Sequence, residues 1–85
     1  MRSFVQGNTY VVNEGLFISK VYNGNIQAYK ERESDLSWMS DIMGVKFIAS
    51  NEDNGKTRKR IKGRSGATWT ISRAWCRDVT NNVRG

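Results

Sequence analysis

The residues best suited to chemistry lie between positions 56 and 64, "KTRKRIKGR", where six of nine side chains are cationic. On a β-strand, alternate side chains share a face, and one face here would carry Lys56, Arg58, Arg60, Lys62 and Arg64. The opposite face would carry Thr57, Lys59, Ile61 and Gly63. Side chains two positions apart on a strand are about 6.5–7 Å apart, close to the phosphate spacing of an extended single strand. The run therefore predicts contact with a polyanion backbone.

Net positive charge is confined to the C-terminal part of the chain. Residues 1–54 hold five Lys or Arg against seven Asp or Glu, a net charge of −2, whereas residues 55–85 hold nine against one, a net charge of +8. Such asymmetry favours a nucleic-acid surface or a contact with an acidic protein. Two alternatives stay open: solvated charges that protect an edge strand from aggregation, and internal ion pairs with Glu31, Glu33 or Asp35.

Tryptophans accompany the basic run. Trp69 lies on the apolar face of an alternating segment and is expected in the core, whereas Trp75, between Arg73 and Arg77, could stack on a base or pack in the core. Trp38 is expected in the core or at a partner contact. The predicted nucleic-acid-binding residues are Lys56, Arg58, Lys59, Arg60, Lys62, Arg64, Arg73, Arg77 and Trp75.

RNA or another single-stranded nucleic acid is the expected partner. The helix predicted near 35–43 carries the acidic residues Glu33, Asp35 and Asp41, which the phosphates of a duplex would repel. Because no RRM or KH signature is present, binding should be electrostatic and weakly sequence-selective. About five phosphate contacts predict that log K falls with log salt at a slope of about −3.5.

Catalytic and metal chemistry find little support in the composition. The chain has no histidine, the commonest general base and zinc ligand, and a single cysteine, Cys76, which we expect to be buried and inert. The segment 51–55, "NEDNG", lacks the spacing of a calcium loop. We therefore expect a non-enzymatic protein without a metal or cofactor.

Cysteine usage and hydropathy bear on the compartment. One cysteine forms no internal disulfide, the N-terminal residues lack the apolar core of a signal peptide, and no segment approaches the length of a membrane span. We expect a cytoplasmic protein.

Hydrophobic patterns predict a small α+β fold of one domain. Segments rich in β-branched and aromatic residues predict a three-stranded meander over about 9–30, with a turn at 23–25. Leu36, Met39, Ile42 and Met43 recur at helical spacing, which predicts one short helix near 35–43 that ends at Gly44.

The second half predicts a strand at about 45–50, a polar loop at 51–55, the basic strand and a strand that ends near Ser72. After Ser72, either a short capped helix or a continued strand is consistent with the sequence, and the tail from about residue 80 should be loosely ordered. We therefore expect five or six strands, arranged in a mostly antiparallel sheet or a partly open barrel. Such a domain could also form homo-oligomers through its strand edges.

A short, histidine-free, Asn-rich basic chain with "KTRKRIKGR" resembles the small accessory proteins of T4-type phages, and among them the RNA-binding antagonists of ToxN-type endoribonuclease toxins. The resemblance implies an antitoxin-like, anti-defence protein that counteracts a host toxin in an RNA-bound complex in the host cytoplasm. The alternative is direct protein–protein inhibition of a host enzyme by the basic hairpin and an apolar anchor on the 35–43 helix, without RNA.

Overall fold

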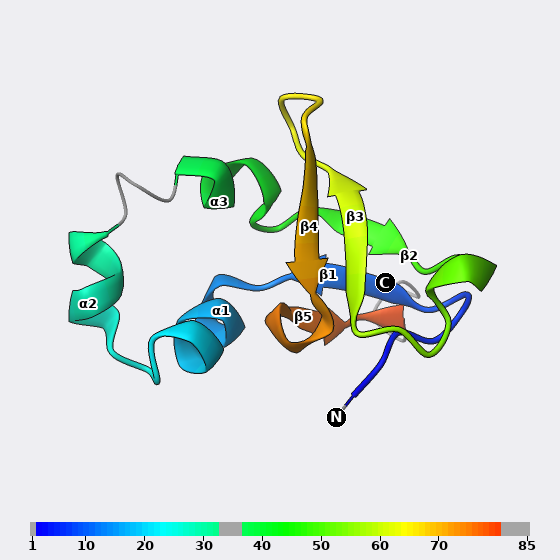
Figure 1. Ribbon diagram of the computed structural model, residues 1–85, viewed down its shortest axis with the longest axis horizontal. Coiled ribbons are helices and arrows are strands. Elements are labelled where there is room, and N and C mark those ends of the chain that lie inside the picture. The colour runs from blue at the N-terminus through cyan, green and yellow to red at the C-terminus, as the bar shows by residue number, and fades with distance from the viewer. Residues whose placement is uncertain (1, 33–36, 81–85) are drawn as a thin grey trace.

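A computed structural model describes residues 2–32 and 37–80 as two antiparallel sheets with helices on one side (Figure 1). The elements in chain order are β1 (Thr9–Val12), α1 (Glu14–Val21), α2 (Ile26–Glu31), α3 (Ser37–Ile42), β2 (Lys46–Ile48), η2 (Asn51–Asp53), β3 (Arg58–Lys62), β4 (Thr68–Ser72), η3 (Arg73–Trp75) and β5 (Cys76–Asp78), where η marks a 3-10 turn. The predicted α+β class is thus confirmed.

β1 is the central strand of the larger sheet. It pairs antiparallel with β2 on one side and β5 on the other, giving the order β2-β1-β5. The second sheet is the β3–β4 hairpin, which runs across the direction of β1 and β2 (Figure 1). The described strands therefore form two open sheets and no closed barrel.

The predicted meander over residues 9–30 is wrong after β1. Asn13 ends the strand, and its side chain accepts a hydrogen bond from the Leu16 N–H at 2.9 Å, which caps α1. Asn25 caps α2 in the same way, through the Ala28 N–H at 3.0 Å. Two asparagines that satisfy free N–H groups at helix starts thus outweigh the strand propensity of the residues that follow.

The turn predicted at 23–25 exists, but it connects α1 to α2 instead of two strands. Asn23 has φ 53° and Gly24 has φ 80°, a left-handed pair that suits these two residue types. The predicted helix near 35–43 is confirmed over Ser37–Ile42, and Gly44 follows it with φ 77°. Residues 35 and 36 of that prediction lie outside the described part. The expectation of one helix is wrong, because the described residues form three.

The second half follows the sequence pattern closely. β2, β3 and β4 form where strands were predicted, and β4 ends at Ser72. Both alternatives after Ser72 occur in succession: its side chain accepts from the Ala74 N–H to cap η3, and the chain then extends as β5. Residues 81–85 of the tail lie outside the described residues.

One apolar core joins the two sheets and the helices. Its buried members are Phe4, Tyr10, Val12, Phe17, Tyr29, Met39, Ile42, Ala49, Ile61, Ile71 and Cys76. α1 contributes Phe17, whose ring meets the rings of Tyr29 and Trp38 with centroids 6.1 Å away in each case. Packing of these large rings explains why short helices of modest propensity are stable here.

The tip of the β3–β4 hairpin is fastened to α3 by Asp41. The carboxylate of Asp41 accepts hydrogen bonds from the Ser65 N–H, the Ser65 hydroxyl and the Trp69 Nε1, each at 2.7 Å. Its backbone carbonyl accepts from the Arg64 N–H at 2.9 Å. Gly63 lies so close that a Cβ there would stand 2.3 Å from Asp41 Oδ2. A side chain at position 63 is therefore excluded by contact with Asp41.

Gly63→Ala should lower the free energy of unfolding by about 1–3 kcal/mol, because the added methyl group displaces the Asp41 carboxylate. Urea titration of the purified protein measures this. Thr68→Ala, an exposed change on the neighbouring strand, should cost less than about 0.5 kcal/mol. In an Asp41→Ala background, the cost of Gly63→Ala should shrink, and an unchanged cost would contradict the contact proposed as its cause.

Candidate nucleic-acid interface

The outer face of the hairpin carries a row of exposed cations. Along β3, Arg58, Arg60 and Lys62 are exposed, while Lys59 and Ile61 face the core. The partner strand adds the exposed Thr68 and Thr70 beside them, since Arg60 pairs with Thr70 and Lys62 with Thr68. The residues that β3 and β4 place on this face thus combine cations and hydroxyl groups, and none of them is a carboxylate.

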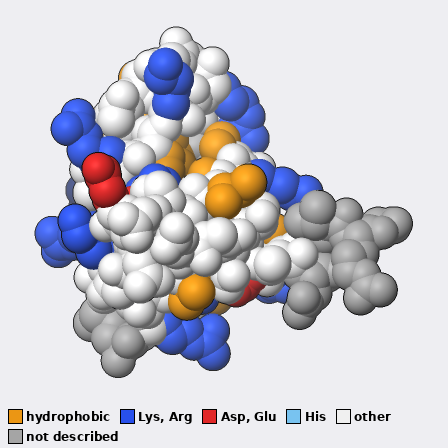
Figure 2. All heavy atoms as spheres, turned by 90° about the vertical axis from the view of Figure 1, so that its right-hand side faces the viewer, with side chains coloured by type: hydrophobic (Ala, Val, Ile, Leu, Met, Phe, Trp, Pro, Cys, Tyr) orange, Lys and Arg blue, Asp and Glu red, His pale blue; other side chains and the backbone are white. Residues whose placement is uncertain are grey.

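Lys56 is exposed just before β3 and extends the row. We call Lys56, Arg58, Arg60 and Lys62 the basic face. A shallow hollow of about 350 Å³ lies beside it, lined by Lys56, Arg58, Arg60 and Thr70 on one side and by Ser50 and the carboxylates Glu52 and Asp53 of the η2 region on the other, with Asp53 already paired to Lys59. Figure 2, in which the hairpin points upward, shows Lys and Arg side chains on both sides of the upper part of the molecule.

Lys59 points away from the basic face and forms an internal ion pair. Its Nζ lies 2.6 Å from Asp53 Oδ2, which also accepts from the Ser50 N–H at 2.7 Å and the Ser50 hydroxyl at 2.9 Å. Burial alone would raise the pKa of Asp53, but the hydrogen bonds from Lys59 and Ser50 outweigh it and hold the pKa below its usual value. Lys59 therefore serves the fold, and its charge is neutralised.

Arg64 is also occupied by an internal contact. Its guanidinium donates to the Ser40 carbonyl at 2.6 Å and to the Met43 carbonyl, both at the end of α3. A cation that binds the free carbonyls of a helix C-terminus stabilises that end of the helix. The face predicted to hold five cations therefore holds four, because the Arg64 side chain is turned to α3.

Arg73 and Arg77 lie apart from the basic face. Arg73 is buried, only 7% exposed, with its guanidinium carbon 4.7 Å from the centroid of the Tyr10 ring. Arg77 is exposed on β5, in the other sheet. The structure thus brings together four of the eight cations that we predicted for the site.

Trp75 packs into an aromatic cluster. Its ring meets Phe17 edge-on, with centroids 4.9 Å apart and an interplanar angle of 85°, and it lies 6.1 Å from Trp38. Trp38 in turn lies 6.1 Å from Trp69. All three tryptophans are half-buried against the core, so only the exposed part of Trp75 is available for a base.

Cys76 is buried, as expected, and the chain has no histidine that could take a proton from its thiol. Burial raises the pKa of Cys76 to about 12, although the nearby Arg73 acts in the opposite direction. The thiol is therefore protonated at neutral pH and is a poor nucleophile.

Neither metal-ligand clusters nor membrane-spanning helices occur in the described residues. No group of three or more Cys, Asp or Glu side chains there is arranged to hold a metal ion. None of the helices within 2–32 and 37–80 is long and apolar enough to cross a bilayer. Comparison with known proteins gives no match to a family model, a curated protein or a solved structure.

Two carboxylates organise this region, Asp41 of α3 beside the hairpin tip and Asp53 beneath β3, and the sequence pattern did not predict this structural role. A signal for the inward-facing cation of β3 was nevertheless present. Lys59 shares the strand parity of the core residue Ile61. Within β3, parity therefore separates the inward-facing Lys59 from the exposed cations on the other face.

Acid should destabilise the protein through its hydrogen-bonded carboxylates. Asp41, whose pKa is lowered by hydrogen bonds from Trp69 and Ser65, and Asp53 both have folded-state pKa values below those of the unfolded chain. A lowered pKa stabilises the fold fully above the unfolded value of about 3.9, and this contribution is lost as pH falls through the folded value. Urea titrations should give a constant stability above about pH 5 and a decline below about pH 4.

Asp53→Asn should reduce the loss of stability that occurs below about pH 4. It should also lower the free energy of unfolding at neutral pH, because Lys59 loses its charged partner. Glu52→Gln changes the charge equally at an exposed neighbouring position and serves as the control. Equal losses in the two variants would contradict the role given to the Lys59–Asp53 pair.

Proposed function

We propose that this protein binds RNA or another single-stranded nucleic acid through the basic face and catalyses no reaction. The observation that carries the proposal is the outer face of the hairpin, where Arg58, Arg60 and Lys62 stand in the open without a carboxylate among them. Mutual repulsion in such a row is relieved by a polyanion. The other strand offers Thr68 and Thr70 as hydrogen-bond donors to phosphate or ribose oxygens.

The contrast between cations that have an internal partner and cations that have none supports the basic face as the binding site. Where a cation is needed for the fold, this protein gives it a partner, as with Lys59 on Asp53 and Arg64 on the end of α3. The four cations of the basic face have no ion-pair partner in the described part of the chain. Binding through them is electrostatic and weakly sequence-selective, because the row offers charges to phosphates and the hollow beside it is shallow.

The resemblance to accessory proteins of T4-type phages gives this binding its proposed biological role, antagonism of a host endoribonuclease toxin through an RNA-bound complex. Direct inhibition of a host enzyme by protein contact alone is less well supported. The apolar anchor suggested for it consists of Leu36, Trp38, Met39 and Met43. Met39 is buried, Trp38 and Met43 are partly buried against the core, and Leu36 lies outside the described residues. The described part of α3 therefore has little apolar surface left for a partner.

RNA affinity should depend on salt in proportion to the contacts made by the basic face. Four phosphate contacts predict a slope of log K against log salt of about −2.8, and Arg58→Ser/Arg60→Ser should reduce it to about −1.4. At 0.1 M salt the double variant should bind about 25-fold more weakly. Fluorescence anisotropy with a labelled oligouridylate across a salt series provides the measurement.

Lys30→Ser/Lys46→Ser is the matched control, since it removes two exposed cations from α2 and β2 and changes the net charge equally. It should keep the wild-type slope. The proposal fails if the Arg58/Arg60 variant retains the affinity and slope of the wild-type protein.

Protein purified from cells should carry RNA, visible as excess absorbance near the nucleic-acid maximum that ribonuclease removes. The Arg58→Ser/Arg60→Ser variant should carry less of it than the Lys30→Ser/Lys46→Ser control. If a cellular partner protein stays bound after ribonuclease treatment, the contact is protein–protein and the alternative holds.

A further inference from the structure

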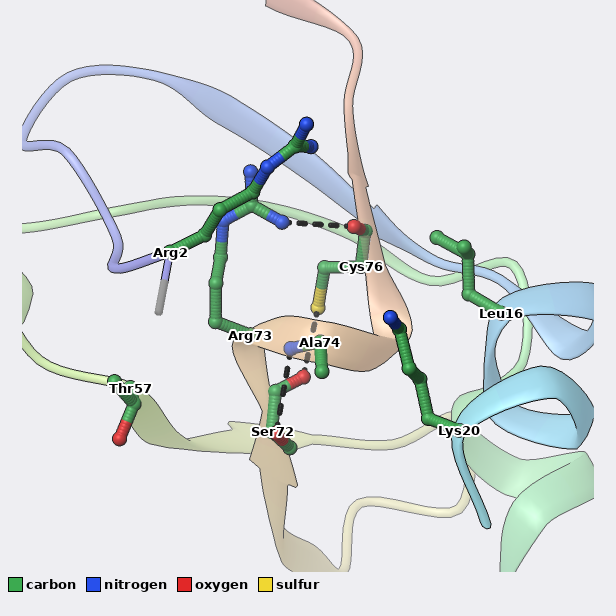
Figure 3. Close-up of a pocket in the computed structure, with 8 residues that line it drawn as sticks. All are labelled: Arg2, Leu16, Lys20, Thr57, Ser72, Arg73, Ala74 and Cys76. Atoms are coloured by element: carbon green, nitrogen blue, oxygen red, sulfur yellow. Dashed lines mark hydrogen bonds between the residues drawn. The ribbon is translucent and has the colours of Figure 1, made fainter. Parts of the chain in front are cut away.

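A second site lies at the base of the hairpin, next to the start of the basic face. It is a cavity of about 640 Å³ bounded by α1, η3 and the N-terminal segment (Figure 3). Three cations line it: Arg2 from the N-terminal segment, Lys20 from α1 and Arg73 from η3. No Asp or Glu is among its lining residues.

Arg73 is a buried cation without a bound carboxylate. Its Nη1 donates to the Cys76 carbonyl at 2.9 Å, while its buried Nε has no hydrogen-bond partner in the described structure. Asp78 is the carboxylate that interacts with it electrostatically, but Asp78 is held instead by Asn8 at 3.0 Å and the Thr80 N–H at 2.9 Å. A buried charge is costly without a counter-charge, so this cavity wall favours an anion.

The two other cations are placed to complete such a site. In Figure 3 the Arg2 side chain lies on the same side of the cavity as Arg73, and Lys20 approaches from the opposite side. Arg2 and Lys20 are exposed and form no ion pair within the described residues. Three positive charges around one space match a dianion better than a single carboxylate.

We propose that this cavity binds a phosphate monoester carried on an organic body, with a nucleoside monophosphate as the representative ligand. Guanidinium groups fit phosphate oxygens by paired hydrogen bonds, and a lysine adds a point charge. Leu16 and Ala74 provide apolar wall for the body of the ligand. The Cys76 thiol, protonated because burial raises its pKa, adds no negative charge to the wall.

The phosphate can come from a free mononucleotide or from the phosphorylated end of a strand bound on the basic face. Thr57 and Ser72 line the cavity, and Ser72 is paired with Arg58, so the cavity adjoins the start of the basic face. The strand-end source rests on the proposed function, whereas binding of a free mononucleotide does not.

Calorimetric titration with uridine monophosphate and with uridine tests the site directly. The monophosphate should bind and uridine should bind at least tenfold more weakly. Arg2→Ser/Lys20→Ser should weaken monophosphate binding at least tenfold, whereas Lys30→Ser/Lys46→Ser, with the same change in charge, should leave it unchanged. Both variants replace exposed side chains, and circular dichroism verifies their folding.

Oligouridylates with a 5′-phosphate, a 3′-phosphate or only hydroxyl ends distinguish the two sources. A strand-end site predicts tighter binding of one phosphorylated strand, with the advantage lost in Arg2→Ser/Lys20→Ser. The site is refuted if neither the monophosphate nor an end phosphate gains affinity over its unphosphorylated counterpart, or if the two double variants behave alike. The hydroxyl-ended strand has no end phosphate, so its binding tests the basic face alone. If the cavity binds no phosphate, the test of the basic face is therefore unaffected.

Discussion

The attachment of the hairpin tip to α3 through Asp41 is the constraint on which the arrangement depends. A two-stranded hairpin is marginally stable by itself, so β3–β4 needs support from the rest of the molecule. Asp41 of α3 provides this support at the tip by accepting hydrogen bonds from Ser65 and Trp69. In addition, the Arg64 guanidinium of the hairpin donates to carbonyls at the end of α3. Held in this way, the strand keeps one face toward the core and the other toward solvent.

The same molecule treats its cations in three different ways. Lys59 and Arg64 have specific internal partners, Arg73 is buried over an aromatic ring, and the basic face is left to solvent. An internal partner lowers the cost of a charge inside the fold, whereas exposed cations in a row keep their repulsion until an anion arrives. Function is therefore inferred from the cations that the fold does not use.

Strand parity and turn residues made the second half predictable. The alternation of Ile61 and Trp69 with polar neighbours fixed the core face of the hairpin, and the three exposed cations of β3 follow from it. In the first half, propensity was misleading. The segment after Asn13 is rich in β-branched and aromatic residues, yet the Asn13 cap and the packing of Phe17 on other rings favour helix.

What the sequence determined by itself is local: the basic strand, its two faces, the turn at 23–25 and a cysteine without a histidine to activate it. Only the tertiary structure decided which cations are free, because the partners of Lys59 and Arg73 come from the turn before β3 and from the Tyr10 ring of β1. It also created the cavity between Arg2, Lys20 and Arg73, residues up to 71 positions apart in the chain. Spacing along a chain fixes the face of a strand, but a charge is neutralised by whatever the fold brings within a few ångströms of it.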